Sequence, residues 1–119
     1  MKKVMVVEDS SLMIAVIRNF IKKENVEVEF LEAHTGDEAV KRYEAEKPDL
    51  VFMDIKMPGM DGLTALEKIR ESHSDAKVVM CTSLKEKENE ERATKAGAVG
   101  YIMKPFSRKD IVDAINMHL

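Results

Sequence analysis

Polar side chains that could take part in chemistry follow four of the apolar runs in this sequence. In chain order they are Glu8 and Asp9, then Asp54, then Thr82, then Lys104. Short runs of large apolar residues indicate buried strands. The carboxyl ends of parallel strands meet at one edge of a sheet, and this edge is where such sheets bind ligands. We therefore expect these five side chains to lie close together.

Three carboxylates at one edge of a sheet need a counter-charge. Two ionised carboxylates about 4 Å apart repel each other by about 4 kcal/mol at an effective dielectric constant of about 20. A cation bound between Glu8, Asp9 and Asp54 would remove this cost, and hard oxygen ligands suit Mg²⁺. His34 does not complete a set of zinc ligands, and Cys81 falls inside an apolar run. The sequence therefore predicts a magnesium site and not a zinc site.

A lysine and a hydroxyl group beside such a metal site indicate phosphoryl chemistry. Lys104 could pair with one phosphoryl oxygen, and Thr82 could donate a hydrogen bond to another. Asp54 is placed to attack as a nucleophile and to form an acyl phosphate. Each residue alone has a simpler explanation, since Asp9 and Thr82 could cap helices and Lys104 could be solvated. That explanation does not account for three carboxylates that converge on one lysine.

Five strands alternate with five helical segments along the chain. Four strands are apolar runs, and the remaining one alternates apolar and acidic residues over 26–30, as is typical of a half-exposed strand at a sheet edge. Strand–helix alternation implies parallel strands, right-handed crossovers and helices on both faces. A closed eight-stranded barrel would need about twice this length. The predicted fold class is therefore α/β, with an open, doubly wound, five-stranded parallel sheet.

Capping residues and apolar stripes predict the helices. Thr35 with Glu38, and Ser107 with Asp110, have the form of a capping box. Asp61 opens the helix that follows the Pro-Gly turn. The first helix is predicted to bury a stripe formed by Met13, Val16, Ile17, Phe20 and Ile21.

The segment 85–96 differs from the other helices. Its inward-facing candidates, Ala93 and Ala96, are small. Pairs of opposite charge four residues apart contribute only about 0.2–0.5 kcal/mol each to a helix. We therefore expect a weakly docked, mobile helix that carries two such pairs, Glu88–Arg92 and Glu91–Lys95.

Length and composition exclude several classes of protein. The 119 residues fit one domain, 1–119, and a net charge of −3 gives no basic surface for direct nucleic-acid binding. No apolar run approaches the roughly 18 residues of a membrane span, and Met1 leads into a strand, so no membrane association is expected. The single cysteine, Cys81, has no partner for an internal disulfide. A cytoplasmic location is therefore predicted.

The ordered set of motifs resembles the receiver domains of response regulators, and the resemblance covers essentially the whole chain. The motifs are Glu8-Asp9, the stretch from Asp54 to Gly62, Thr82, and the stretch from Ala96 to Phe106 that contains Lys104-Pro105. The family implies a flavodoxin-like sheet with strand order 2-1-3-4-5. It also implies a phosphorylation-switched module of a two-component system that is not a turnover enzyme.

The resemblance also implies a role for each matching residue. Asp54 corresponds to the phosphoacceptor, and Glu8, Asp9, Asp54 and the backbone carbonyl of Lys56 correspond to the Mg²⁺ site. The longer Glu8 side chain could reach the metal through a water molecule. Lys56 and Leu84 occupy positions that influence the rate of dephosphorylation in this family.

The remaining matches concern the switch and the partners. Lys104 corresponds to the lysine that contacts the phosphoryl group, and a cis peptide bond to Pro105 is expected. Thr82 and Tyr101 correspond to the hydroxyl–aromatic switch pair. The implied partners are a sensor histidine kinase or histidine phosphotransfer domain, and a downstream protein target. Because one helix follows Lys104 and no output domain does, a stand-alone regulator of the chemotaxis or phosphorelay type is expected.

Two other functions remain open at this stage. A small Mg²⁺-dependent phosphatase would also use an aspartate nucleophile, but such enzymes generally need a second acid two residues later, where this chain has Lys56. A flavodoxin-like cofactor binder should donate hydrogen bonds to a phosphate from its first loop, and Glu8 and Asp9 would repel that phosphate instead.

Overall fold

The structure of the chain is a computed structural model that describes residues 1–83 and 87–119. Within these ranges the chain alternates five strands with five helices. The strands are β1 (Lys2–Val7), β2 (Val28–Ala33), β3 (Leu50–Asp54), β4 (Val78–Thr82) and β5 (Gly100–Met103). The helices are α1 (Ser11–Lys22), α2 (Gly36–Glu46), α3 (Gly62–Ser72), α4 (Lys87–Lys95) and α5 (Arg108–His118).

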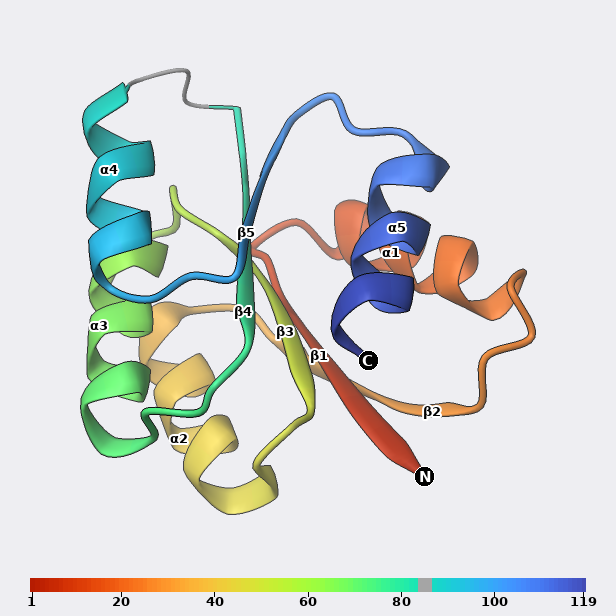
Figure 1. Cartoon of the computed structure of the whole chain (residues 1–119), viewed down its shortest axis with the longest axis horizontal. Helices are drawn as coiled ribbons and strands as arrows, with labels where there is room; N and C mark the ends of the chain where they lie inside the picture. Colours follow the sequence, from red (N-terminus) through yellow and green to blue (C-terminus); the bar gives the residue numbers. More distant parts are fainter. Residues whose placement is uncertain (84–86) are drawn as a thin grey trace.

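The strands form one parallel sheet in the order β2-β1-β3-β4-β5. Helices α1 and α5 cover one face, and α2, α3 and α4 cover the other (Figure 1). The predicted fold class and strand order are both confirmed. The alternating strand, β2, lies at an edge as predicted, and its exposed fraction alternates along its first residues.

The central strand β3 is buried on both faces, which explains its unbroken apolar sequence. Val51 and Met53 pack into the layer under α2, α3 and α4, whereas Leu50 and Phe52 pack into the layer under α1 and α5. Successive side chains of a strand point to opposite faces. A strand between two helical layers therefore needs apolar residues at every position.

Capping residues lie at four of the helix starts, and three of them, Thr35, Asp61 and Ser107, were predicted. The side chains of Ser10, Thr35, Asp61 and Ser107 each accept a backbone hydrogen bond from the first turn of a helix. The capping box at Ser107 is complete, with Asp110 in the place of the more usual glutamate. At α2, the Glu38 N–H donates to Thr35 Oγ1 over 3.1 Å. These caps fix where α2, α3 and α5 begin relative to the preceding strands.

Two details of the predicted helices were wrong. In α1 the buried residues are Ile14, Ile17 and Ile21, whereas Met13 and Phe20 are only partly buried. Ile17 and Ile21 are buried as predicted, and Ile14 is buried as well, because both the sheet and α5 cover this helix.

The second error concerns the ion pairs of α4. Arg92 pairs with Glu67 of α3 and not with Glu88. Its Nη2 and Nε donate to the two carboxylate oxygens of Glu67 at 2.7 and 3.1 Å. Its Nη2 also donates to Thr64 Oγ1 at 3.3 Å. Glu67 accepts two hydrogen bonds from the guanidinium group, and a bidentate pair of this kind is stronger than a single contact. Ala93 is buried as predicted, and Leu84 and Lys85 lie outside the described residues.

Over 1–83 and 87–119, no helix combines the length and the apolar character that a membrane crossing requires.

A matched pair of leucines tests the assignment of the core. Leu66 of α3 is fully buried, whereas Leu12 of α1 is 76% exposed. Leu66→Ala should lower the free energy of unfolding by about 2–5 kcal/mol because it removes buried methyl groups and leaves a cavity. Leu12→Ala should change it by less than about 0.5 kcal/mol. Urea denaturation measures both values, and equal losses would contradict the described packing.

Candidate functional site

The carboxyl edge of the sheet brings the predicted site residues together. Asp54 is the last residue of β3, and Glu8 directly follows β1, where its N–H donates to the Ala33 carbonyl over 3.0 Å. Thr82 ends β4, and the Lys104 N–H donates to the Thr82 carbonyl over 2.7 Å. The backbone that carries these side chains is therefore held by the sheet and by hydrogen bonds that extend it.

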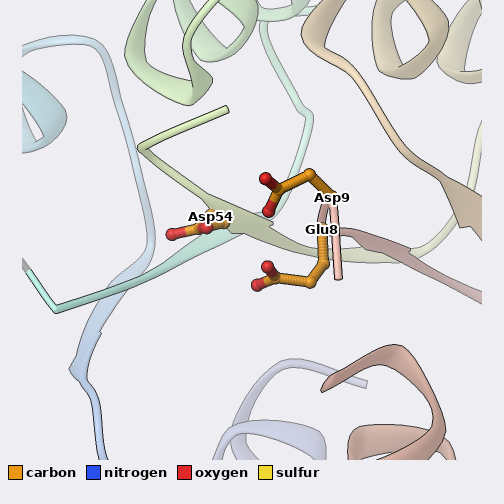
Figure 2. A group of neighbouring side chains, drawn as sticks. All are labelled: Glu8, Asp9 and Asp54. Carbon is orange, nitrogen blue, oxygen red and sulfur yellow. The ribbon is translucent and has the colours of Figure 1, made fainter. Parts of the chain in front are cut away.

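Glu8, Asp9 and Asp54 form a cluster of carboxylates. One oxygen from each lies within 4.8 Å of the others. Figure 2 shows the three carboxylate groups projecting to the same side of the sheet edge. Mg²⁺ binds oxygens at about 2.0–2.1 Å, so ligands on opposite sides of the ion are about 4.2 Å apart. The donor set suits Mg²⁺, and small movements of these side chains would bring the oxygens to this spacing around an ion that keeps several of its waters.

Lys104 lies against this cluster. Its Nζ is 2.8 Å from Glu8 Oε2 and 3.5 Å from Asp54 Oδ2. The other Glu8 oxygen accepts a hydrogen bond from the Ser10 N–H over 3.4 Å. The lysine thus supplies a positive charge between two buried carboxylates. The sequence predicted Lys104 at this edge, but it did not predict the direct pair with Glu8.

Burial and the neighbouring opposite charge shift the pKa values of Glu8, Asp54 and Lys104 in opposite directions. Burial raises the pKa of both Glu8 and Asp54, because each carboxylate loses contact with water, and nearby carboxylates add to the rise. The Lys104 ammonium opposes the rise in both cases. Burial lowers the pKa of Lys104, but the hydrogen bond with Glu8 and the charge of Asp54 outweigh this effect and raise it. Lys104 is therefore charged at neutral pH, and the site keeps its internal cation.

The other predicted residues differ in their burial. Thr82 is fully buried, and Tyr101 is partly buried against the core layer under α2, α3 and α4. Lys56 is exposed, but its neighbours Ile55 and Met57 are buried. The Lys104–Pro105 peptide bond is cis, as predicted.

Among the residues that the structure describes, the acidic cluster includes neither His34 nor Cys81. His34 Nε2 lies 3.9 Å from a Glu32 oxygen, and Cys81 is buried in β4. Burial raises the pKa of the Cys81 thiol, so it stays protonated.

A cavity of about 350 Å³ lies at the other end of the sheet and is a poor candidate for the site. Its lining includes Lys2, Lys47, His73, Lys77 and His118. Helices α2, α3 and α5 all end there. Cations are favourable at helix C-termini, where the helix dipole is negative. This explains the lysines without a ligand.

The chain is similar to known proteins over nearly its whole length. A family model described as "Response regulator receiver domain" matches residues 4–116. The chemotaxis protein CheY of Halobacterium salinarum is 43% identical over 115 residues, covering 97% of this chain and 94% of that protein. The protein of the same name from Bacillus subtilis is 38% identical over 117 residues, covering 98% and 97%.

Solved structures agree with these sequence relatives. The CheX–CheY–BeF3–Mg²⁺ complex of Borrelia burgdorferi matches with a TM-score of 0.90 and 29% identity, covering 98% of this chain and 87% of that one. The response regulator protein TrrA of Thermotoga maritima, in complex with Mg²⁺ and a beryllium fluoride, matches with a TM-score of 0.89 and 28% identity over the full length of both chains.

The ion pair between Lys104 and Glu8 can be tested by a double-mutant cycle. Lys104→Met should lower the free energy of unfolding by about 1–3 kcal/mol, because it leaves the buried Glu8 carboxylate without its charged partner. Adding Glu8→Gln to this variant should recover much of the loss. Chemical denaturation of the four proteins gives the coupling energy. Strictly additive effects would contradict the pairing.

The carboxylate cluster predicts that Mg²⁺ stabilises the folded protein. At a concentration 100-fold above its dissociation constant, the ion should add about 2.7 kcal/mol to the free energy of unfolding. Thermal unfolding with EDTA and with saturating Mg²⁺ measures the difference. Asp9→Asn removes one carboxylate and should shrink it. Identical melting temperatures of the unmodified protein in the two buffers would count against a metal site.

Proposed function

Because the chain belongs to the family of response regulator receiver domains, we propose that it is a phosphorylation-switched signalling module in which Asp54 accepts the phosphoryl group. The donor is the phosphohistidine of a sensor histidine kinase or of a histidine phosphotransfer domain. One observation carries the proposal. The Asp54 carboxylate ends a buried central strand, clusters with Glu8 and Asp9, and lies 3.5 Å from the Lys104 ammonium.

The proposed transfer uses the Asp54 carboxylate as the nucleophile. Its oxygen attacks the phosphorus, a P–O bond forms, and the P–N bond to the donor imidazole breaks. The electron pair of that bond returns to the imidazole nitrogen. With the other ring nitrogen of the donor already protonated, the products are an acyl phosphate and a neutral histidine. Burial favours this role, because it leaves the carboxylate oxygens less solvated than those of an exposed aspartate.

Mg²⁺, when bound, would neutralise the charge that the phosphoryl oxygens bring to the site. Glu8, Asp9, Asp54 and the backbone carbonyl of Lys56 would hold it. Support for the metal comes from the spacing of the three carboxylates and from the Mg²⁺ named in the two similar structures. The exposed Asp9 side chain leaves one side of the cluster open to solvent, from which the ion and the donor would arrive.

Lys104 and Thr82 complete the proposed phosphoryl site. Lys104 exchanges its contact with Glu8 for a phosphoryl oxygen, and Glu8 turns to the metal, so each charge keeps a partner throughout. The Thr82 hydroxyl donates a hydrogen bond to another oxygen, and Tyr101 moves with it. Both residues lie on strands next to α4, so α4 and β5 would carry the change to a downstream protein target.

The chemotaxis pathway is the proposed setting. It is suggested by the CheY relatives from Halobacterium salinarum and Bacillus subtilis, and the similar Borrelia burgdorferi protein is in complex with CheX. The product of the transfer stays bonded to Asp54, so the module is not a turnover enzyme. Lys56 supports this, because a phosphatase would need a second acid at that position.

Asp54→Asn tests the phosphoacceptor. The protein with its own sequence should take up about one phosphoryl group per chain from radiolabelled acetyl phosphate with Mg²⁺, whereas Asp54→Asn should take up none, because an amide is not a nucleophile here. Asp75 is exposed and lies before β4, at the opposite end of the sheet, so Asp75→Asn should take up as much label as the unmodified protein. Unchanged labelling of Asp54→Asn would overturn the proposal. Continuous hydrolysis of phosphomonoesters would instead support a phosphatase.

A further inference from the structure

The loop between β3 and α3, residues 55–61, approaches the start of α2. Gly36 is the first residue of α2, and it lies against Met60 of this loop. A Cβ atom at position 36 would lie 2.5 Å from the Met60 carbonyl oxygen and 2.9 Å from its Cγ. Real Cβ atoms essentially never come this close to another heavy atom. Only glycine therefore allows the helix and the loop to approach as they do.

The requirement at Gly36 is for space and not for an unusual backbone conformation. Gly36 is the first helical residue of α2 and does not have a positive φ, so alanine could adopt its backbone conformation and is the better helix former. A structural role confined to α2 would thus favour alanine. Glycine at this position needs another explanation, and the contact with Met60 provides one.

Both α2 and the 55–61 loop are anchored close to this contact. The start of α2 is fixed by the Thr35 cap and by Ala39, which is fully buried. On the other side, the Gly62 N–H donates to the Ile55 carbonyl over 2.7 Å and closes the loop at its base. Met57 is buried between these ends. The contact at Met60 thus belongs to the same short, closed loop as Lys56.

We propose that Gly36 is a positioning residue for the metal site, because its missing side chain lets α2 pack against the 55–61 loop, which carries the Lys56 carbonyl two residues after Asp54. This inference rests on the proposed function, in which that carbonyl is a Mg²⁺ ligand. Gly36 touches neither metal nor substrate. It acts through Met60 and the loop, in the way that outer residues orient the ligands of a metal.

Gly36→Ala tests the inference, with Mg²⁺ affinity as the readout. Isothermal titration calorimetry should give a dissociation constant roughly tenfold weaker than that of the unmodified protein, the lower end of the ~10–100-fold loss seen for outer-shell changes. Asp37→Ala is the matched control: it alters the next residue of the same helix turn, is exposed, and adds nothing against the loop. It should leave the dissociation constant unchanged.

A second variant covers the case in which Gly36→Ala does not fold. Met60→Ala removes the side chain that lies on Gly36 and loosens the loop without adding an atom. It should also weaken Mg²⁺ binding, by a smaller factor, while thermal unfolding in EDTA shows that the protein is folded.

The outcomes separate this inference from the proposed function. If the unmodified protein binds Mg²⁺ and both variants bind it as tightly as Asp37→Ala does, Gly36 has a packing role only and the inference is overturned. A lower melting temperature of Gly36→Ala with an unchanged dissociation constant leads to the same conclusion. If the unmodified protein itself does not bind Mg²⁺, the proposed metal site fails, and this inference fails with it.

Discussion

The structure of the site depends on the balance between three carboxylates and one ammonium group. Glu8 and Asp54 are buried, so each would be costly to ionise without a nearby positive charge. Lys104 supplies that charge from a position 96 residues after Glu8. A buried pair of this kind is weak evidence for stability, since desolvation offsets much of the attraction. The role of the pair here is to offset the repulsion between the carboxylates, so that they can stay close together and ionised.

The sheet makes this balance possible because it fixes the backbone on both sides of the central strand. The register places Asp54 opposite Cys81 of β4, and Val7, the residue before Glu8, opposite Met53 of β3. Both faces of β3 are buried, so the strand cannot slip by one residue without turning its side chains into the wrong layer. The carboxylates therefore keep their positions even though their mutual repulsion would separate them on a flexible chain.

Helix α4 is held more loosely than the sheet. Arg92 binds Glu67 across the two helices, but both side chains are more than 40% exposed. Exposed pairs of this kind contribute at most about 1 kcal/mol. A helix attached largely by small residues and one exposed ion pair can shift at low cost. This agrees with the proposed movement of α4 after phosphorylation, whereas α1, with its three buried isoleucines, is packed more firmly.

The sequence by itself determined the order of the elements, the caps at Thr35 and Ser107, and the edge of the sheet at which Glu8, Asp9, Asp54 and Lys104 meet. Apolar runs and capping residues are local signals, and parallel topology turns the ends of strands into neighbours. Only the tertiary structure decided that Lys104 pairs with Glu8, that Arg92 chooses Glu67 over Glu88, and that Gly36 touches Met60. Each of these depends on the distance between elements far apart in the chain, and no local pattern of residues encodes that distance.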